Sequence, residues 1–303
     1  MGKRPIRVAI VTTVHNRRET TLQCLRSLCA VDRTGMVVHM VVVDDGSTDG
    51  TAEAISREFP DVELVRGDGN LWYTAGTNRA IEAGLKWNPE YILAINDDSV
   101  FHPGFLRHMV NCAQQNPRSV IGALLLLWDR PDRVFQVDAR WDTWYGGWRH
   151  RCDLTIDNIS REAREVEIIV GNCVLYPVTA IREVGLMNER YFTNFADVEY
   201  TPRMRKAGWR LLLAPEAHVY CQPNTLSTPL REMPFSKLFH ILFFNRRSHY
   251  NLVTLFLNRW TSAPNYFLGF LAYIITLVRM ALRWAGILKK WPDRMDGWNI
   301  ETG

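Results

Sequence analysis

The sequence predicts an α/β fold with a doubly wound, mostly parallel central sheet and a helical C-terminal region. Three β-branched runs, at 7–13, 37–43 and 62–66, alternate with segments in which apolar residues recur at helical spacing. Such alternation of strands and helices is typical of a parallel sheet. The second run shows no polar alternation, which indicates a strand that is buried on both faces.

The connections between these runs carry the expected turn signals. Gly46 permits a turn after the second strand, and residues 47–49 (Ser, Thr, Asp) can cap the helix that follows. The loop 67–78 contains three glycines and leads into a helix that ends at Trp87. Further along, the patterns predict helices at 104–116, 178–184 and 201–207, and strands at 120–128, 166–177 and 209–214.

Two regions depart from this alternation. The segment 129–165 is rich in Trp and Arg, and we interpret it as a lid or a loop that faces a substrate; an irregular β-hairpin packed on the sheet is the alternative. The region 231–303 holds ten Lys+Arg and four Asp+Glu, a net charge of +6, which leaves about −2 for residues 1–230 out of the total of +4. We therefore expect a main domain over 1–230 and a basic, aromatic helical region over 231–303.

The basic region contains the apolar run Tyr266 to Val278, which is short for a membrane span of about 20 residues. Tryptophans and Lys/Arg follow it, a composition typical of helices that lie in a membrane surface. The alternative is a soluble appendage used for packing or for a homodimer. The N-terminus leads into a strand rather than an apolar leader, so we expect no secretion signal.

The most informative stretch is the apolar run 91–95, which leads directly into Asn96, Asp97 and Asp98. A buried strand cannot hold two charges in its middle, so the carboxylates belong at its carboxyl end, where α/β sheets bind ligands. A divalent cation is a common remedy for the repulsion between adjacent carboxylates. The alternative is a solvated turn that caps a helix.

Several other site types are excluded by their missing motifs. None of the six cysteines forms a C-x-x-C pair, so a zinc ribbon is not expected and the thiols read as reduced core residues. The chain contains no phosphate loop of the kinase type and no complete dinucleotide fingerprint. No feature indicates nucleic-acid binding.

Acidic clusters follow two parallel strands, Asp44-Asp45 and Asp97-Asp98, and should share one crevice at the sheet edge. A nucleoside diphosphate fits this arrangement. Asp44 or Asp45 would accept hydrogen bonds from a base or ribose, and Asp98 would hold a metal beside the diphosphate. Asp197, further along, would remain available as a general base.

Six stretches carry a resemblance to a known family: 11–17 (VTTVHNR), 41–51 (VVVDDGSTDGT), 70–83 (NLWYTAGTNRAIEA), 95–100 (INDDSV), 171–188 and 192–209. In this order they resemble family 2 inverting glycosyltransferases of the GT-A fold, with its Rossmann-like nucleotide-binding half. The resemblance extends over residues 7 to about 223. The last two stretches and the Asn70 loop are most similar to bacterial rhamnosyltransferases of O-antigen and cell-wall polysaccharide synthesis.

The resemblance implies roles for individual residues. Asp197 matches the catalytic base, and Asp98 ends a DxD-like motif that binds Mg²⁺ or Mn²⁺. His218 is a candidate further metal ligand, and Arg203 matches an arginine in the helix after the base. The residues implied to contact the nucleotide or the donor sugar are Thr12, Thr13, Asn16, Arg17, Asp44, Asp45, Asn70, Gly76, Asn78, Arg79 and Asp97.

The sequence departs from the family pattern in two places. Ala196 stands where the family has the Glu of its Glu-Asp pair, and Cys221 stands near the position of a frequent His, with His218 three residues earlier. Without the resemblance, Asp197 would be read as the N-cap of the following helix.

We therefore expect an inverting transfer of a sugar, rhamnose being one candidate, from a dTDP-, UDP- or GDP-linked donor to a hydroxyl of a glycan. The acceptor is expected to be linked to a polyprenyl lipid, and the protein to be cytoplasmic and peripheral at the inner face of the cell membrane. The alternatives are a sugar nucleotidyltransferase and a non-catalytic carbohydrate-binding relative.

Overall fold

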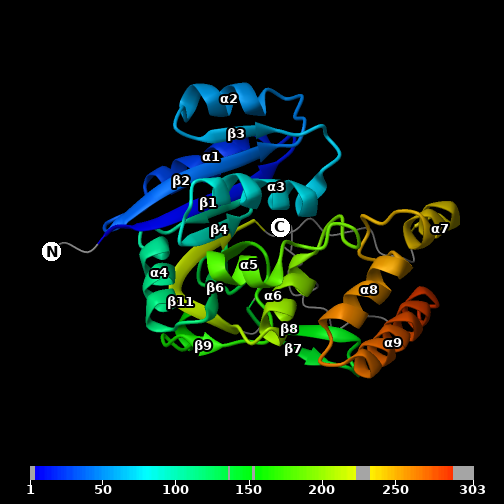
Figure 1. Ribbon diagram of the computed structural model, residues 1–303. Helices are drawn as coiled ribbons and strands as arrows, with labels where there is room; N and C mark the ends of the chain where they lie inside the picture. Colours follow the sequence, from blue (N-terminus) through cyan, green and yellow to red (C-terminus); the bar gives the residue numbers. More distant parts are fainter. Residues whose placement is uncertain (1–3, 136, 152–153, 223–232, 289–303) are drawn as a thin grey trace.

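The computed structural model describes residues 4–135, 137–151, 154–222 and 233–288 (Figure 1). The N-terminal half alternates strands and helices as the sequence predicts. Its elements are β1 (Ile6–Val14), α1 (Arg18–Cys29), β2 (Met36–Asp44), α2 (Thr51–Glu58), β3 (Glu63–Arg66), α3 (Trp72–Lys86), β4 (Tyr91–Ile95), β5 (Ser99–Phe101) and α4 (Phe105–Gln115).

The second half is less regular. Its elements are β6 (Ser119–Leu127), β7 (Val137–Asp142), β8 (Gly147–Arg151), the 3₁₀ turn η1 (Ile156–Asn158), β9 (Arg164–Glu165), β10 (Cys173–Pro177), α5 (Val178–Val184), α6 (Asp197–Lys206), β11 (Arg210–Cys221), α7 (Phe235–Phe243), α8 (Leu252–Ser262) and α9 (Tyr266–Trp284). The strand expected over 166–177 is confined to its last five residues, and the last strand continues seven residues beyond the expected Ala214.

The central sheet has the order β3-β2-β1-β4-β10-β6-β11-β5, with β9 paired to β11. Strands β1 to β4 are parallel to one another, which confirms the doubly wound half. Strand β10 runs antiparallel to both β4 and β6, and β5 runs antiparallel to β11. The sheet is therefore parallel in its N-terminal half and mixed beyond β4.

The core lies on both faces of this sheet. Alternate residues of β4 belong to different clusters: Leu93 and Ile95 pack in the cluster that includes α1, α2 and α4, whereas Ile92 and Ala94 pack in the cluster that includes α3, α5 and α6. This two-residue period explains why the strand is apolar throughout. Burial on both faces leaves the carboxyl end of β4 as the first place where its chain can carry charge.

The region 129–165 contains a separate two-stranded sheet, β7–β8, so the expected hairpin is present, but the expectation that it packs on the central sheet is not what the contacts of its strands show. The hairpin packs on the C-terminal helices, as the contact of β8 with α9 shows. Gly146 in its turn has φ +96° and its carbonyl accepts hydrogen bonds from Arg259 Nε and Thr276 Oγ1. The turn of the hairpin, which contains two glycines with positive φ, thus holds α8 and α9 to the body of the protein.

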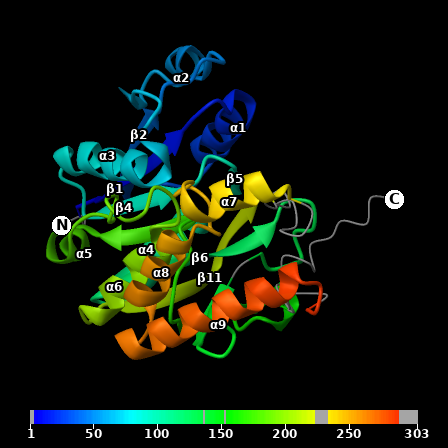
Figure 2. The same cartoon turned by 90° about the vertical axis from the view of Figure 1, so that its right-hand side faces the viewer.

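The C-terminal helices α7, α8 and α9 lie together on one side of the molecule (Figures 1 and 2). Helix α8 packs on α6 and α9 packs on α8. Residues 244–251 separate α7 from α8. The expected boundary at residue 230 lies outside the described residues.

Helix α9 is longer than the sequence interpretation allowed. It has 19 residues, and by length and composition it is apolar enough to cross a membrane. Its two faces differ: Gly269, Ala272 and Thr276 are buried against the protein, while Phe267, Phe270, Ile274 and Val278 are exposed.

Candidate active site

The carboxyl ends of β1, β2 and β4 lie side by side and bring their three loops together. Val14, the last residue of β1, pairs with Asp44 at the end of β2, and Val11 pairs with Ala94 of β4. The acidic residues that follow β2 and β4 are therefore brought to the same edge of the sheet, as expected.

Asp45 holds the loop that begins α3. Its Oδ1 accepts a hydrogen bond from the Gly69 N–H at 2.9 Å, and its Oδ2 accepts from the N–H groups of Leu71 and Trp72 at 3.0 and 2.9 Å. The side chain is buried, and both oxygens are already satisfied. The expectation that Asp45 contacts the base is not what this geometry favours, because binding a base would require it to release the loop.

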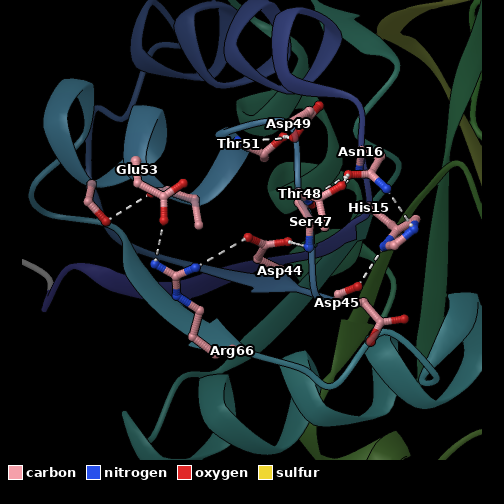
Figure 3. Close-up of polar contacts among 12 residues, drawn as sticks. His15, Asn16, Asp44, Asp45, Ser47, Thr48, Asp49, Thr51, Glu53 and Arg66 are labelled. Atoms are coloured by element: carbon pink, nitrogen blue, oxygen red, sulfur yellow. Dashed lines mark hydrogen bonds and ion pairs between the residues drawn. The ribbon is translucent and has the colours of Figure 1, made fainter.

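Asp44 is the acid of this pair with unused hydrogen-bonding capacity. It is fully buried; its Oδ1 accepts from the Ser47 N–H at 2.9 Å, and its Oδ2 has no hydrogen-bond partner among the described residues. Arg66 lies 3.9 Å from that oxygen (Figure 3). A buried carboxylate oxygen without a donor is costly, so Asp44 can accept a further hydrogen bond.

Asn16 joins the loop after β1 to the loop after β2. Its Oδ1 accepts from the Thr48 N–H at 2.7 Å, and its own N–H donates to Ser47 Oγ at 2.9 Å (Figure 3). His15 Nδ1 lies 2.6 Å from the Asp45 carbonyl oxygen. Asn16 has φ +49°, a left-handed conformation that asparagine tolerates better than most residues.

Arg17 bridges the two acids after β4. Its Nη1 lies 3.0 Å from Asp97 Oδ1, and its Nη2 lies 3.1 Å from Asp98 Oδ2. Asp97 also accepts a hydrogen bond from Thr21 Oγ1 at 3.0 Å. Burial raises the pKa of Asp97 to about 6, while the charge of Arg17 opposes this shift and that of Asp98 adds to it. The guanidinium thus supplies the cation that two adjacent carboxylates need.

One carboxylate oxygen of Asp98 is suited to bind a divalent cation. Its Oδ1 is buried without a hydrogen-bond partner among the described residues, as is Asn96 Oδ1 two residues earlier. Hard cations prefer such oxygen ligands. The described residues contain no group of three or more His, Cys, Asp or Glu arranged to hold a metal. A metal here would therefore need oxygens from its substrate as well.

His218 is not brought to Asp98 by the structure. It lies opposite His102, whose N–H donates to the His218 carbonyl, and the two rings are 5.8 Å apart. Gln222, four residues further along, is the residue whose N–H faces the Asp98 carbonyl. Four residues of extended strand separate the two positions by roughly 13 Å, which is too far for a shared ion.

Cys221 does not take the place of a metal-binding His. Its side chain is completely buried, with Sγ 3.5 Å from Ser99 Oγ and 3.9 Å from Asn172 Nδ2. Burial raises the pKa of this thiol to about 12. Its full burial and its contacts with Ser99 and Asn172 make Cys221 a core residue.

Asp197 is the first residue of α6, and its side chain does not cap this helix. The N-cap is Ala196, and an Asp197 carboxylate oxygen accepts from the Gly171 N–H at 3.0 Å. The N-cap interpretation is therefore wrong. Burial raises the Asp197 pKa, and the hydrogen bonds from nearby N–H groups only partly oppose it. A carboxylate with a raised pKa is suited to accept a proton.

Tyr73 lies beside the candidate base at Gly171. Its hydroxyl donates to the Gly171 carbonyl at 3.4 Å, and its pKa is raised first by burial and then by the negative charges of Asp197 and Asp98. Gly171 is required here, because an added Cβ would lie 2.5 Å from Tyr73 Oη and 2.9 Å from Asp197 Cβ. The start of α6 and the start of α3 therefore meet at Gly171.

The residue before the base, Ala196, is fully buried in the apolar cluster of α3, α5 and α6. A carboxylate at this position would have to be buried among apolar side chains. The nearby acid, Glu199, is instead paired with Arg203, whose Nε lies 2.7 Å from Glu199 Oε1. Arg203 also donates to the carbonyls of Val184 and Leu186, so it holds a loop in place.

The α3 residues implied for the donor pocket are mostly structural. Asn78 is buried and forms hydrogen bonds with both the N–H and the carbonyl of Met187. Gly76 allows α3 to approach Thr13, since an added Cβ would collide with Thr13 Oγ1. Arg79 and Asn70 are exposed, while Thr12 is buried with its hydroxyl unpartnered among the described residues.

The segment between α7 and α8 reaches the site from the opposite side. The Arg247 guanidinium lies 3.4 Å from the ring centroid of Trp72, the first residue of α3. The His249 ring is 6.3 Å from Phe195, two residues before the candidate base. The C-terminal region therefore contacts the starts of both α3 and α6.

Comparison with known families identifies this arrangement. Residues 9–185 match the model of "Glycosyl transferase family 2", which is more than half of the chain. The chain belongs to glycosyl transferase family 2.

Curated relatives of this family 2 chain include the N-acetylglucosaminyl-diphospho-decaprenol L-rhamnosyltransferase of Mycobacterium tuberculosis, found in strains CDC 1551 and H37Rv. It is 29% identical over 209 residues, which cover 60% of this chain and 66% of that protein. The low-salt glycan biosynthesis hexosyltransferase Agl10 of Haloferax volcanii is 23% identical over 57% of this chain and 55% of its own length. This chain thus spans less than two thirds of either relative.

Solved structures confirm the GT-A type of fold and no more than the fold. GalNAc-T7 with UDP, GalNAc and Mn²⁺ aligns with a TM-score of 0.59 at 12% identity, over 96% of this chain and 59% of its own. TarS from S. aureus with UDP aligns with a TM-score of 0.55 at 14% identity, over 97% of this chain and 78% of its own. The mannosyltransferase PcManGT from Pyrobaculum calidifontis with GDP-Man and Mn²⁺ aligns with a TM-score of 0.52 at 14% identity, over 97% of this chain and 83% of its own.

Several residues that shape the site of this family 2 chain were not singled out from the sequence: Thr21, Tyr73, Gly171 and Arg247. Thr21 lies one helical turn after Arg17, so its contact with Asp97 has a local signal in the sequence. Gly171 and Tyr73 meet across 98 positions, and Arg247 reaches Trp72 across a still longer separation. No periodicity or short motif indicates such contacts.

Proposed function

We propose that this chain is an inverting glycosyltransferase that moves a sugar from a nucleoside-diphosphate donor to a hydroxyl of a lipid-linked glycan. The observation that carries the proposal is Asp197, a buried carboxylate that accepts a hydrogen bond from the Gly171 N–H and whose pKa is raised by burial. The rhamnosyltransferase relative supports rhamnose as the donor sugar to test first, and its name supports a diphospho-prenol acceptor.

Asp197 acts as the base in this proposal. It accepts the proton of the acceptor hydroxyl, whose oxygen attacks the anomeric carbon from the face opposite the leaving nucleoside diphosphate. The C–O bond to the donor phosphate breaks as the new C–O bond forms, so a single displacement inverts the configuration. The Gly171 N–H fixes the orientation of the carboxylate.

Arg17, Asp97 and Asp98 form the donor side of the proposed site. Asp98 Oδ1, together with phosphate oxygens, would hold Mg²⁺ or Mn²⁺. The cation would offset the negative charge of the diphosphate. Arg17 is about two-fifths exposed, and it carries a positive charge beside the same place. Asp44, with one buried oxygen still unpartnered among the described residues, is the better candidate of its pair for a contact with the nucleotide.

The membrane surface is the proposed location of this reaction. The exposed face of α9 carries Phe267, Phe270, Ile274 and Val278, and Arg283 follows in its last turn. An apolar face flanked by cations suits insertion at a bilayer interface. We propose that the protein works on the cytoplasmic side as a peripheral enzyme. Phe267→Glu should weaken sedimentation with anionic vesicles, whereas Val37→Glu, an exposed apolar site on β2, should not.

A transfer assay tests the proposed activity. The purified chain is incubated with dTDP-rhamnose, UDP-sugars or GDP-sugars and a GlcNAc-diphospho-prenol acceptor, and both nucleotide release and product are measured. We expect Asp197→Asn to lower transfer by a factor of about 10² to 10⁴ while donor binding persists. The matched control is Asp61→Asn, an exposed carboxylate outside the site. Unimpaired transfer by folded Asp197→Asn would remove the base from the mechanism.

The same experiment separates the alternatives. A nucleotidyltransferase would join a nucleotide to a sugar phosphate, and a carbohydrate-binding relative would release no nucleotide with any donor. The metal is tested by direct binding: Mn²⁺ titration followed by electron paramagnetic resonance should show weaker binding in Asp98→Asn than in Asp61→Asn. Equal binding by both variants would place the ion elsewhere.

A further inference from the structure

A cavity of about 260 Å³ lies between the body and the C-terminal helices. Its walls come from the start of α6, the segment between α7 and α8, and helices α8 and α9. Phe195 and Val198 line it, and these two residues flank Asp197 in the chain. The cavity therefore lies against the start of α6, on the side where the C-terminal helices face the viewer in Figure 2.

The lining combines positive charge with apolar surface. Three basic side chains contribute, His249, Arg259 and Arg283, and among the described residues no carboxylate lines the cavity. Leu255 and Met280 supply apolar walls. The pKa of His249 is lowered, first by desolvation and then by the charge of Arg259, so the two arginines supply the positive charge of the lining. Such a lining suits a ligand that is anionic at one end and apolar beyond it.

The two arginines are held differently. Arg259 is anchored by its bonds to the Gly146 carbonyl and to Asn258 Oδ1, and an added Cβ on Gly147 would lie 2.7 Å from its Nε. The Arg283 guanidinium makes no ion pair or hydrogen bond with another described residue. A half-buried guanidinium without an acid partner leaves its donors available to phosphate oxygens.

The apolar side of the cavity continues onto α9. Thr276 and Met280 line the cavity, while Ile274 and Val278, on the same helix, belong to the exposed apolar face. Residues two apart point to opposite sides of a helix, so one face of α9 lines the cavity and the other is the surface proposed to meet the membrane. A ligand whose anionic group enters the cavity can place its first apolar atoms against Leu255 and Met280.

We propose that this cavity binds the diphosphate and the first isoprene units of the acceptor's lipid carrier. Arg283 and Arg259 contact the diphosphate, and Leu255 and Met280 contact the isoprene. This inference rests on the proposed function, because it assigns the lipid part of that function's acceptor to a site beside Asp197. It explains why the C-terminal region packs on α6 instead of standing apart as an appendage.

The test compares two acceptors that carry the same sugar, a prenyl-diphosphate glycan and a short alkyl glycoside without phosphate. For Arg283→Gln we expect KM for the prenyl-diphosphate acceptor to rise at least tenfold, with kcat/KM for the alkyl glycoside unchanged. The matched control is Arg205→Gln, an exposed arginine of α6 that does not line the cavity, and it should change neither value. An equal rise of KM for both acceptors, or no rise, would overturn the proposal.

Direct binding keeps the inference separate from the reaction. Calorimetric titration of Asp197→Asn with farnesyl diphosphate should show binding that is lost when Arg283→Gln is added. Farnesol and inorganic diphosphate should each bind at least tenfold more weakly than farnesyl diphosphate. Met280→Trp, which fills the cavity without removing charge, should also abolish binding. If the wild-type chain transfers no sugar but this pattern holds, the proposed function fails and the site stands.

Three outcomes contradict the site itself. The first is equal binding of farnesyl diphosphate by folded Arg283→Gln, Met280→Trp and the wild-type chain. The second is tight binding of inorganic diphosphate alone, which would make the cavity a phosphate site without a lipid role. The third is an Arg283→Gln variant that no longer binds phosphatidylglycerol vesicles but still binds farnesyl diphosphate. That result would assign Arg283 to bulk lipid headgroups.

Discussion

Replacing Asn78 with Ala tests whether this residue serves the fold or the donor. Its Oδ1 accepts from the Met187 N–H at 3.0 Å, its Nδ2 donates to the Met187 carbonyl at 2.9 Å, and the side chain is 5% exposed. The variant leaves both buried groups of Met187 without partners, at about 1–3 kcal/mol each. Alanine regains about 0.5 kcal/mol through its higher helix propensity. We expect a net loss of about 3 kcal/mol in the free energy of unfolding.

The measurement is urea denaturation followed by circular dichroism, together with KM for the donor at a temperature where the variant is folded. Asn70→Ala is the matched control, because Asn70 is exposed and its amide makes only a long contact, 3.5 Å, with the Asp68 carbonyl. The control should change stability by less than about 0.5 kcal/mol. A variant at Asn78 with wild-type stability and a raised donor KM would refute the structural role and restore Asn78 to the donor pocket.

Three further predictions concern the base and the packing behind it. Gly171→Ala should lower kcat by about a hundredfold, because the new Cβ would displace Tyr73 or Asp197 by more than the tolerance of a positioned base. Gly76→Ala should cost about 1–3 kcal/mol of stability through overpacking against Thr13, and Thr13→Ala in the same chain should restore part of it. The pH profile of kcat/KM should fall on the acid side at a pH above the ordinary carboxyl value of 3.8, because Asp197 must be ionised to accept a proton and burial raises its pKa.

Each of these has a control within the chain. Gly104→Ala meets no atom closer than 3.4 Å and should leave kcat unchanged. If Gly76→Ala were as stable as the wild-type chain, α3 would not approach β1 as closely as described. If the acid limb of the profile persisted unchanged in the residual activity of Asp197→Asn, another group would be responsible for it.

The parallel half of the fold was readable from the sequence for a physical reason. Strands β1, β2 and β4 are covered on both faces, so their residues are apolar without alternation, and the change to Asp44 or Asp97 marks where each strand leaves the core. The mixed half was harder to predict. Strand β10 has only five residues and lies antiparallel between two strands from other parts of the chain, which no local pattern encodes.

The candidate site shows the same division. The sequence by itself determined which strand ends carry carboxylates, and hence that Asp44, Asp97 and Asp98 lie at one edge, because parallel strands end together. Only the tertiary structure decided which groups are already engaged. Asp45 accepts hydrogen bonds from backbone N–H groups, and Asn78 forms hydrogen bonds with the backbone of Met187. Arg17 forms ion pairs with Asp97 and Asp98, and His218 lies away from Asp98. These outcomes depend on contacts between segments distant in the chain, whose geometry is set by packing and not by local spacing.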